Sequence, residues 1–441
     1  MKPSSCPDPE LDRLLVSNEI MIDPYPIYRR LRETAPVFWS DSWNAWVVSR
    51  FDDVGESLRD KENLSNENRQ GLLFSGLSDA ERETLSPLRH YFAQKDVIGS
   101  DPPDHTRMRA LVQKAFTPKT IASLESRIRT LAESLIGAAC RRDRRFDFVH
   151  DVAHPLPVIL IAELLGASVE DRPLFKRWSS EVLAFQGTGV TTFGPAMVSQ
   201  TALMEMFGYM NRLIDQRRAS PQDDLITVLA LAEENGRGFS RDELLATCNT
   251  LLTAGHETTT NLLGNLVHLL LAHPEQWAAL KAKPALIGPA IDEALRYEAP
   301  KQRNFRRVKK AHTFTGVSLG ENEMVFQLIG SANRDPARIS DPDTFNIHRP
   351  KIDHFSFGSG IHFCLGAPLA KLEARVVLET LLAYLPDVQL VPDSLKWQER
   401  VQFRGPRSLL LEWSGGPVRS NVPIGERPPV SATTGGCPIG H

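Results

Sequence analysis

Apolar positions recur at helical spacing through the middle of the chain. The clearest helix begins at Ser240, because Ser240 and Glu243 form a capping-box pattern, and it runs without proline to His273. Its roughly 32 residues would span about 48 Å at 1.5 Å per residue. Other segments with apolar residues every three or four positions are Ile121 to Ile136, Pro157 to Leu165, Met204 to Ile214, Leu225 to Leu231 and Leu365 to Leu385.

Short runs of β-branched and aromatic residues lie on either side of this helical region. Near the N-terminus, a helix from Tyr25 to Arg32 precedes two strand-like runs, which predict a small sheet. Three further runs after Pro300 predict a second sheet region. The five runs are Val37 to Trp39, Ala45 to Val48, Phe305 to Val308, His312 to Phe314 and Met324 to Leu328.

These patterns predict a mainly α protein with small β-sheets, of the α+β class. Residues 51 to 100 have weak periodicity, which predicts a short helix followed by a long irregular loop. Residues 415–441 contain six Gly and five Pro without periodicity, so we expect a disordered tail. We expect the remaining residues, 1–414, to form a single domain, and the protein to be a monomer.

Composition indicates which binding partners and which cellular compartment to expect. The 441 residues carry 51 Lys and Arg against 54 Asp and Glu, a balance that gives no reason to expect nucleic acid or an anionic membrane surface as partner. No run approaches the roughly 20 apolar residues that a membrane span needs, and the N-terminus lacks the pattern of a secretory signal. Five scattered Cys argue against a disulfide framework and favour the reducing cytoplasm.

One of these cysteines lies in a distinctive loop. In Phe357-Gly-Ser-Gly-Ile-His-Phe-Cys364, a glycine-punctuated segment leads straight into a predicted helix. A thiolate at that position would meet the positive end of the helix dipole and free backbone N–H groups, which should lower the pKa of Cys364 and keep it a metal-ligating anion. The alternative for a lone cysteine is a small buried hydrophobic residue.

The segment resembles the haem-binding loop of the cytochrome P450 family, in which a Phe and glycines, here Phe357 and Gly358, lead to one axial cysteine. The resemblance covers most of the chain from Asp101 to Leu411. It implies the cytochrome P450 fold, with haem b (iron protoporphyrin IX) between the long central helix and the helix after Cys364, and with Cys364 as the iron ligand.

A second stretch, Ala254-Gly255-His256-Glu257-Thr258, lies in the middle of the long helix. The resemblance implies that Gly255 lies beside the iron, that Thr258 donates a hydrogen bond to dioxygen, and that Glu257 feeds protons towards it. The alternative is a plain helix with a polar face. The stretch is not a zinc HExxH motif, because position 260 is Thr.

Two further groups of charged residues match the family. Glu293 and Arg296, three apart on one helix face, and Arg349 resemble a buried Glu-Arg-Arg network that stabilises the core behind the haem. Four cations resemble the partners of the two haem propionates: His105, Arg109, Arg306 and His362. Arg107 is a weaker competitor for Arg109, because Arg109 shares the helix face of His105.

The implied reaction is insertion of one oxygen atom from O₂ into a small hydrophobic substrate, by hydroxylation or epoxidation, of the kind found in secondary metabolism. No flavin or iron–sulfur segment is visible, so we expect a separate ferredoxin or flavodoxin with its reductase as the electron donor. A basic patch for that donor is expected at Arg107, Arg109, Lys114 and Lys119. A peroxide-driven peroxygenase and a non-catalytic haem-thiolate ligand-binding protein are the alternatives.

Correspondence with the family also predicts a mostly apolar substrate pocket. The expected residues are Phe185, Phe193, Leu251, Ala254, Lys301, Phe305 and Phe403. Lys301-Gln-Arg303 is unusually polar for such a pocket edge; it is either a solvated turn or a recognition element for a substrate carboxylate. Near the end of the chain, Cys437 and His441 supply too few ligands for a structural zinc site.

Overall fold

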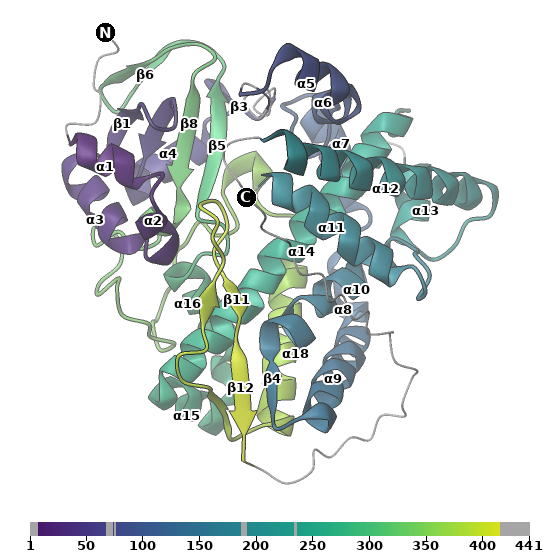
Figure 1. Cartoon of the computed structure of the whole chain (residues 1–441), viewed down its shortest axis with the longest axis vertical. Helices are drawn as coiled ribbons and strands as arrows, with labels where there is room; N and C mark the ends of the chain where they lie inside the picture. The colour runs from purple at the N-terminus through teal and green to yellow at the C-terminus, as the bar shows by residue number, and fades with distance from the viewer. Residues whose placement is uncertain (1–7, 68–73, 75, 187–191, 233–235, 415–441) are drawn as a thin grey trace, which may run out of the picture.

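The computed structural model of the chain describes residues 8–67, 74, 76–186, 192–232 and 236–414, with the side chains of 183–186 outside that description (Figure 1). The predicted tail, 415–441, lies outside the described residues. A helical body carries a small sheet along one side, as the sequence predicts. No helix in the described part of the chain is long and apolar enough to cross a membrane.

The central element is α14, Arg241–Ala272, whose 32 residues run through the middle of the molecule (Figure 1). The predicted capping box is present: Ser240 accepts a hydrogen bond from the Glu243 N–H, and the Glu243 carboxylate accepts one from the Ser240 N–H. Helices α10, Pro155–Leu164, α11, Arg172–Gln186, α16, Ile287–Tyr297, and α18, Ala367–Tyr384, all pack against α14.

The remaining helices surround this centre. Shorter ones are α1 Pro9–Leu14, α2 Asn18–Ile22, α3 Tyr25–Thr34, α4 Phe51–Arg59, α7 Asp104–Gln113, α13 Leu225–Leu231, α15 Pro274–Ala282 and α17 Ile329–Ala332. The 27-residue α12 spans Phe193–Ala219. The segment predicted as one helix from Ile121 to Ile136 is two, α8 Pro118–Ser123 and α9 Glu125–Arg142, because the chain bends at Leu124.

Four of the five predicted runs belong to one five-stranded sheet with strand order β1-β2-β8-β5-β3, and the fifth, His312 to Phe314, lies in a separate hairpin. Strand β2 pairs in parallel with β8, so that Trp46 lies opposite Val325. The strands of this sheet are β1 Val37–Ser40, β2 Ala45–Val48, β3 Leu64–Ser65, β5 Arg303–Val308 and β8 Met324–Leu328.

Three smaller sheets complete the described part of the fold. A three-stranded sheet has the order β4-β12-β9, and two hairpins pair β6 with β7 and β10 with β11. Their strands are β4 Arg145–Asp147, β6 His312–Phe314, β7 Val317–Leu319, β9 Val388–Leu390, β10 Lys396–Trp397, β11 Pro406–Ser408 and β12 Leu410–Trp413. The β10–β11 hairpin lies across α14 in Figure 1.

The prediction of a long irregular loop after α4 is wrong. Two helices, α5 Asp79–Thr84 and α6 Ser86–Ala93, lie between residues 76 and 94. Ser78 and Glu81 form a capping box on α5, and α6 buries Leu88 and Tyr91 against the helical body. Weak periodicity hid them because each helix is shorter than three turns and buries few side chains.

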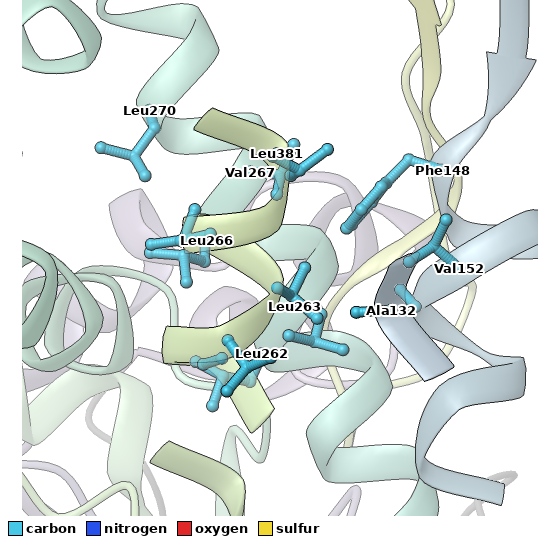
Figure 2. Packing of buried hydrophobic residues seen from close by; sticks show 14 of the residues in the cluster. Ala132, Phe148, Val152, Leu262, Leu263, Leu266, Val267, Leu270 and Leu381 are labelled. Carbon is cyan, nitrogen blue, oxygen red and sulfur yellow. The ribbon is translucent and has the colours of Figure 1, made fainter. Parts of the chain in front are cut away.

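Two large hydrophobic clusters hold the helices around α14. In the first, Leu262, Leu263 and Leu266 of α14 pack against α18 and against Phe148 and Val152, as Figure 2 shows. The second joins α6, α7 and α10–α13 to the N-terminal half of α14. The middle of α14, from Thr253 to Thr260, lies between the two clusters, and it carries four threonines together with His256 and Glu257.

Candidate active site

The loop before α18 is held in a tight conformation by its backbone. The Cys364 N–H donates to the Phe357 carbonyl at 2.8 Å. Gly358 and Gly360 both have φ near +71°, a left-handed conformation that favours glycine. A Cβ on Gly360 would also lie 3.1 Å from the Leu58 carbonyl oxygen of α4. The loop therefore fixes where Cys364 lies at the start of α18.

The Cys364 thiol is flanked by donors and cations. The N–H groups of Gly366 and Ala367 and the charges of Arg109 and Lys301 all favour the thiolate. Burial of the thiol has the larger effect, however, and it raises the pKa of Cys364. The prediction that this pKa is lowered is therefore wrong. The expected donors at the helix N-terminus are nevertheless present, and a metal cation would add the charge that a thiolate needs.

An open stripe interrupts the buried surface of α14. Ala254 and Gly255 are exposed, and Leu251 and Thr258 are partly exposed, although most residues of this helix are buried. The four positions lie on one helix face, at spacings of three, four and seven residues. A Cβ added to Gly255 would meet no atom within 4 Å. The stripe thus faces open space.

Four predicted cations gather beside the Cys364 loop. The His105 and His362 rings lie with centroids 4.2 Å apart, and Arg109 donates to the Phe363 carbonyl at 2.8 Å. Burial, together with the charges of Arg109 and Arg306, lowers the pKa of His105 to about 4, so His105 is a neutral hydrogen-bonding group near pH 7 and the prediction of a cation at this position is wrong. Among the described residues, the buried Nε2 of His105 has no hydrogen-bond partner.

Arg306 is oriented by a residue that the sequence did not indicate. Its guanidinium donates to the Asn66 side chain at 2.5 Å, and Asn66 is itself buried. Arg107 lies elsewhere: it pairs with Glu243 and donates to the Gly238 carbonyl. Arg109 therefore belongs to the cation cluster, and the prediction that Arg107 contributes to an open basic patch is wrong.

These features fit the haem that the resemblance implies. An unpartnered buried imidazole nitrogen and neighbouring guanidinium groups suit two carboxylates. The stripe around Gly255, which has no side chain, suits a flat group, and the enclosed sulfur of Cys364 suits the role of a soft metal ligand. His105, Arg109, Arg306 and His362 would hold the carboxylates, and Cys364 the metal.

The two residues expected to handle protons point in different directions. The Thr258 hydroxyl donates to the Ala254 carbonyl at 2.7 Å, on the open stripe. Glu257 is buried and accepts a hydrogen bond from Arg400 at 3.2 Å. Burial raises the pKa of Glu257, while Arg400 and Gln398 act against that rise. Sequence reasoning missed Arg400, because it lies 143 residues away in a segment without periodicity.

The structure brings only some of the predicted pocket residues together. Lys301 forms an isolated β-bridge with the buried Phe403, and its charge acts on the Cys364 thiol. Leu251 and Ala254 lie on the open stripe of α14. These four residues come from three separate segments of the chain, and the pocket that they are expected to line stays a prediction.

The pairing of β5 with β8 argues against Phe305 as a pocket residue. It lies opposite Phe326 in the β5–β8 pairing, with ring centroids 5.8 Å apart. Adjacent residues of a strand point to opposite faces, and Arg306 belongs to the cation cluster, so Phe305 faces away from that cluster. Phe193, at the start of α12, packs against the second hydrophobic cluster. The side chain of Phe185 lies outside the described residues.

The Glu293-Arg296-Arg349 network is present and buried. Arg296 donates twice to the Glu293 carboxylate, at 2.7 and 2.8 Å, and Arg349 donates once at 3.0 Å. Glu293 and Arg296 are fully buried. Both arginines also donate to backbone carbonyls between Asn333 and Thr344, so the network fastens α16 to the segment that precedes the Cys364 loop.

Comparison with known proteins agrees with this geometry. The sequence model of the family described as "Cytochrome P450" matches residues 74–283 and 286–398. Cytochrome P450 107B1 of Saccharopolyspora erythraea is 38% identical over 402 residues, 89% of this chain and 96% of that protein. The cytochrome P450 monooxygenase PikC of Streptomyces venezuelae is 36% identical over 92% of this chain and 95% of its own length. A solved cytochrome P450 structure from Chondromyces apiculatus superposes with a TM-score of 0.81 at 36% identity, covering 92% of this chain and 98% of that one.

Proposed function

This chain belongs to the cytochrome P450 family, and from that premise we propose that it inserts one oxygen atom from O₂ into a small hydrophobic substrate, by hydroxylation or epoxidation. The observation that carries the proposal is the combination of the Cys364 thiol at the start of α18 with the open stripe around Gly255. Haem b ligated by a thiolate supplies the chemistry of O–O bond cleavage. The protein supplies the ligand, the pocket and the protons.

The residues of α14 give the protein its part in the reaction. Thr258 holds a hydroxyl proton on the open stripe, and Glu257 holds a carboxyl group one residue away, on the side of Arg400. We assign the delivery of protons to this pair. His105, Arg109, Arg306 and His362 bind the carboxylates of the cofactor, and Cys364 binds its metal.

The test is turnover with a surrogate ferredoxin and reductase, scored as product formed per NADPH consumed. Thr258→Ala should keep consuming NADPH while product falls about tenfold and hydrogen peroxide rises, because the general acid–base contribution is typically 10²–10⁴-fold and water replaces part of it. Thr259→Ala, a buried neighbour on another face of the helix, is the matched control. Equal product yields for the two variants would contradict the assignment.

The same assay separates the alternatives. A peroxygenase would form product from hydrogen peroxide at the full rate without NADPH. A ligand-binding protein would show spectral changes with ligands but no product under either condition.

The substrate class can be narrowed by ligand-induced changes in the haem spectrum. Terpenoids, steroids, fatty acids and macrolides form a suitable panel, since Leu251, Ala254 and Phe403 give the pocket an apolar lining.

The hypothesis that Lys301 recognises a substrate carboxylate is supported by the effect of its charge on the Cys364 thiol. Lys301→Ala should weaken fatty-acid binding more than steroid binding; an equal effect on both would exclude that hypothesis.

We also propose that electrons come from a ferredoxin or flavodoxin that docks beside Cys364. Phe363, the residue before it, is 46% exposed and accepts a hydrogen bond from Arg109. Lys114 and Lys119, which follow Arg109 along the chain, are both exposed. Reversing Lys114 and Lys119 to Glu should slow reduction, with the larger effect at low salt. Lys310→Glu, on the exposed turn after β5, should leave reduction unchanged. The cytoplasmic location and the monomeric state stay predictions.

A further inference from the structure

One face of α14 is polar where it meets the C-terminal hairpin. Glu257, Asn261, Asn265 and His268 recur at spacings of four, four and three residues, which places them on the same side of the helix. The hairpin lies directly against this face. Asn265 donates to the Arg404 carbonyl at 3.0 Å, and the His268 ring lies 5.7 Å from that of Trp397.

Gln398 and Arg400 of the hairpin complete the contact, and the six residues together are called the polar seam here. Gln398 donates to Asn261 at 2.9 Å and also hydrogen bonds with the Glu257 carboxylate. Arg400 forms the ion pair with Glu257. The Glu257 side chain is 11% exposed and that of Arg400 is 29% exposed, so the ion pair links solvent to a buried acid.

The polar seam contains several buried atoms that need a further partner. Among the described residues, no hydrogen-bond partner is found for Asn261 Nδ2, Gln398 Oε1, Asn265 Oδ1 or His268 Nδ1. Buried polar groups are bonded to protein or to ordered water, and each such water makes about three hydrogen bonds. Over the roughly 16 Å from Glu257 to His268, the polar seam therefore offers several sites for bound waters.

Charged groups on the other sides of Glu257 do not replace Arg400. The neighbouring His256 is fully buried and bonds with Ser179 of α11 at 2.7 Å, and its pKa lies well below its ordinary value because of burial. Its ring faces His154, whose pKa burial lowers to about 4, so both imidazoles are neutral near pH 7. The charge of Lys176 acts on these two histidines, whereas Arg400 is the cation, among the described residues, whose charge lowers the pKa of Glu257.

We propose that Arg400 is the positioning residue of Glu257 and that protons reach Glu257 from solvent along the polar seam between α14 and the hairpin. The inference rests on the proposed function, in which each O₂ takes up two electrons from the redox partner and two protons from water, one oxygen atom entering the substrate and the other leaving as water. Arg400 holds the carboxylate towards the waters of the polar seam. To pass the proton to Thr258, the Glu257 side chain would turn from the polar seam towards the open stripe.

The first experiment compares Arg400→Gln with Arg400→Lys and with a matched control, Arg407→Gln, which removes an exposed arginine from the same hairpin. Product per NADPH and its pH profile are measured for each. We expect Arg400→Gln to lower product per NADPH about fivefold and to move the profile of kcat by about one pH unit, effects of the size seen when a charge partner is lost. Arg400→Lys should restore most of the yield.

A second readout does not depend on turnover. Without Arg400, the pKa of Glu257 in the folded protein rises further above its unfolded value. Arg400→Gln therefore keeps its stability at pH values below the ordinary pKa of a glutamate. It loses stability as the pH rises through the pKa that Glu257 has in the folded protein. Urea unfolding at pH 5 and pH 8 should show this loss in Arg400→Gln and not in Arg400→Gln combined with Glu257→Gln.

The outcomes are distinguishable. If Arg400→Gln behaves like Arg407→Gln in both readouts while the wild type forms product, the inference is wrong and the proposed function stands. If only the unfolding readout responds, Arg400 is a structural partner and the proton route is refuted. If the wild type forms no product from any substrate of the panel, the proposed function itself fails.

Discussion

Replacing Glu293 with glutamine should destabilise the protein by several kcal/mol, because its carboxylate is the only acid that the network offers to two arginines. One oxygen accepts hydrogen bonds from Arg296 Nη2, Arg349 Nε and the Asn346 N–H, at 2.7, 3.0 and 2.9 Å. The other oxygen accepts from Arg296 Nε at 2.8 Å. A glutamine keeps the first oxygen, but its NH₂ group then faces the Arg296 Nε–H.

The size of the effect follows from burial. Glu293 and Arg296 are fully buried and the Arg349 side chain is 10% exposed, so the guanidinium groups cannot turn to water. Removing one partner of a buried ion pair typically costs about 3–5 kcal/mol, because the remaining charge is left uncompensated. Glu293→Gln removes the charge opposite two guanidinium groups at once, so we expect the upper half of that range.

The measurement is urea unfolding followed by far-UV circular dichroism. The matched control is Asp52→Asn, the same acid-to-amide change in the exposed pair of Asp52 and Arg338, whose side chains are 65% and 54% exposed. Exposed pairs contribute about 0–1 kcal/mol. A loss of less than about 1 kcal/mol for Glu293→Gln, or no more than for the control, would refute the reasoning.

Three further predictions concern the cofactor site and the core. His105→Ala should speed the transfer of haem to apomyoglobin about 10- to 100-fold, a change equivalent to the loss of one hydrogen bond to a charged group. Arg107→Ala, on the same helix, should leave the transfer rate unchanged. Equal transfer rates for the two variants would show that His105 does not bind the haem. Gly360→Ala should cost at least about 1–2 kcal/mol in unfolding experiments, since φ is +71° and the new Cβ meets the α4 backbone; a neutral effect would contradict this. Glu373 is buried, and burial raises its pKa to about 8, so the stability of the wild type should fall as the pH rises from 5 to 8. Glu373→Gln should reduce that fall by about 3–4 kcal/mol. Parallel plots of unfolding free energy against pH for the two proteins would argue against a buried neutral Glu373.

The sequence predicted α14 best, since local signals define both of its ends. The Ser240–Glu243 capping box starts the helix, and His273-Pro274 follows its last residue, Ala272. The Cys364 loop is local in the same way, because its glycines, its cysteine and the helix that follows are consecutive. Short helices without long apolar stripes, such as α5 and α6, gave no comparable signal.

Pairing between distant segments could not be derived from local patterns. The parallel contact of β2 with β8 joins residues about 280 positions apart and unites two predicted sheets. Strand alternation then decides which residues face the cation cluster, and it turns Phe305 away while Arg306 faces it. A one-residue change in that register would have exchanged the two, so the pocket could be predicted only in part.

By itself, the sequence determined the identity of the chemical groups: the thiol of Cys364, the acid and alcohol at 257 and 258, and the histidines and arginines at 105, 109, 306 and 362. Only the tertiary structure decided which partner each group has. In the folded protein, Arg107 forms an ion pair with Glu243, Arg306 donates a hydrogen bond to Asn66, and Glu257 forms an ion pair with Arg400. The physical reason is that helical and strand periodicity are set by neighbours along the chain, whereas a charge is balanced by whatever folding brings within about 4 Å.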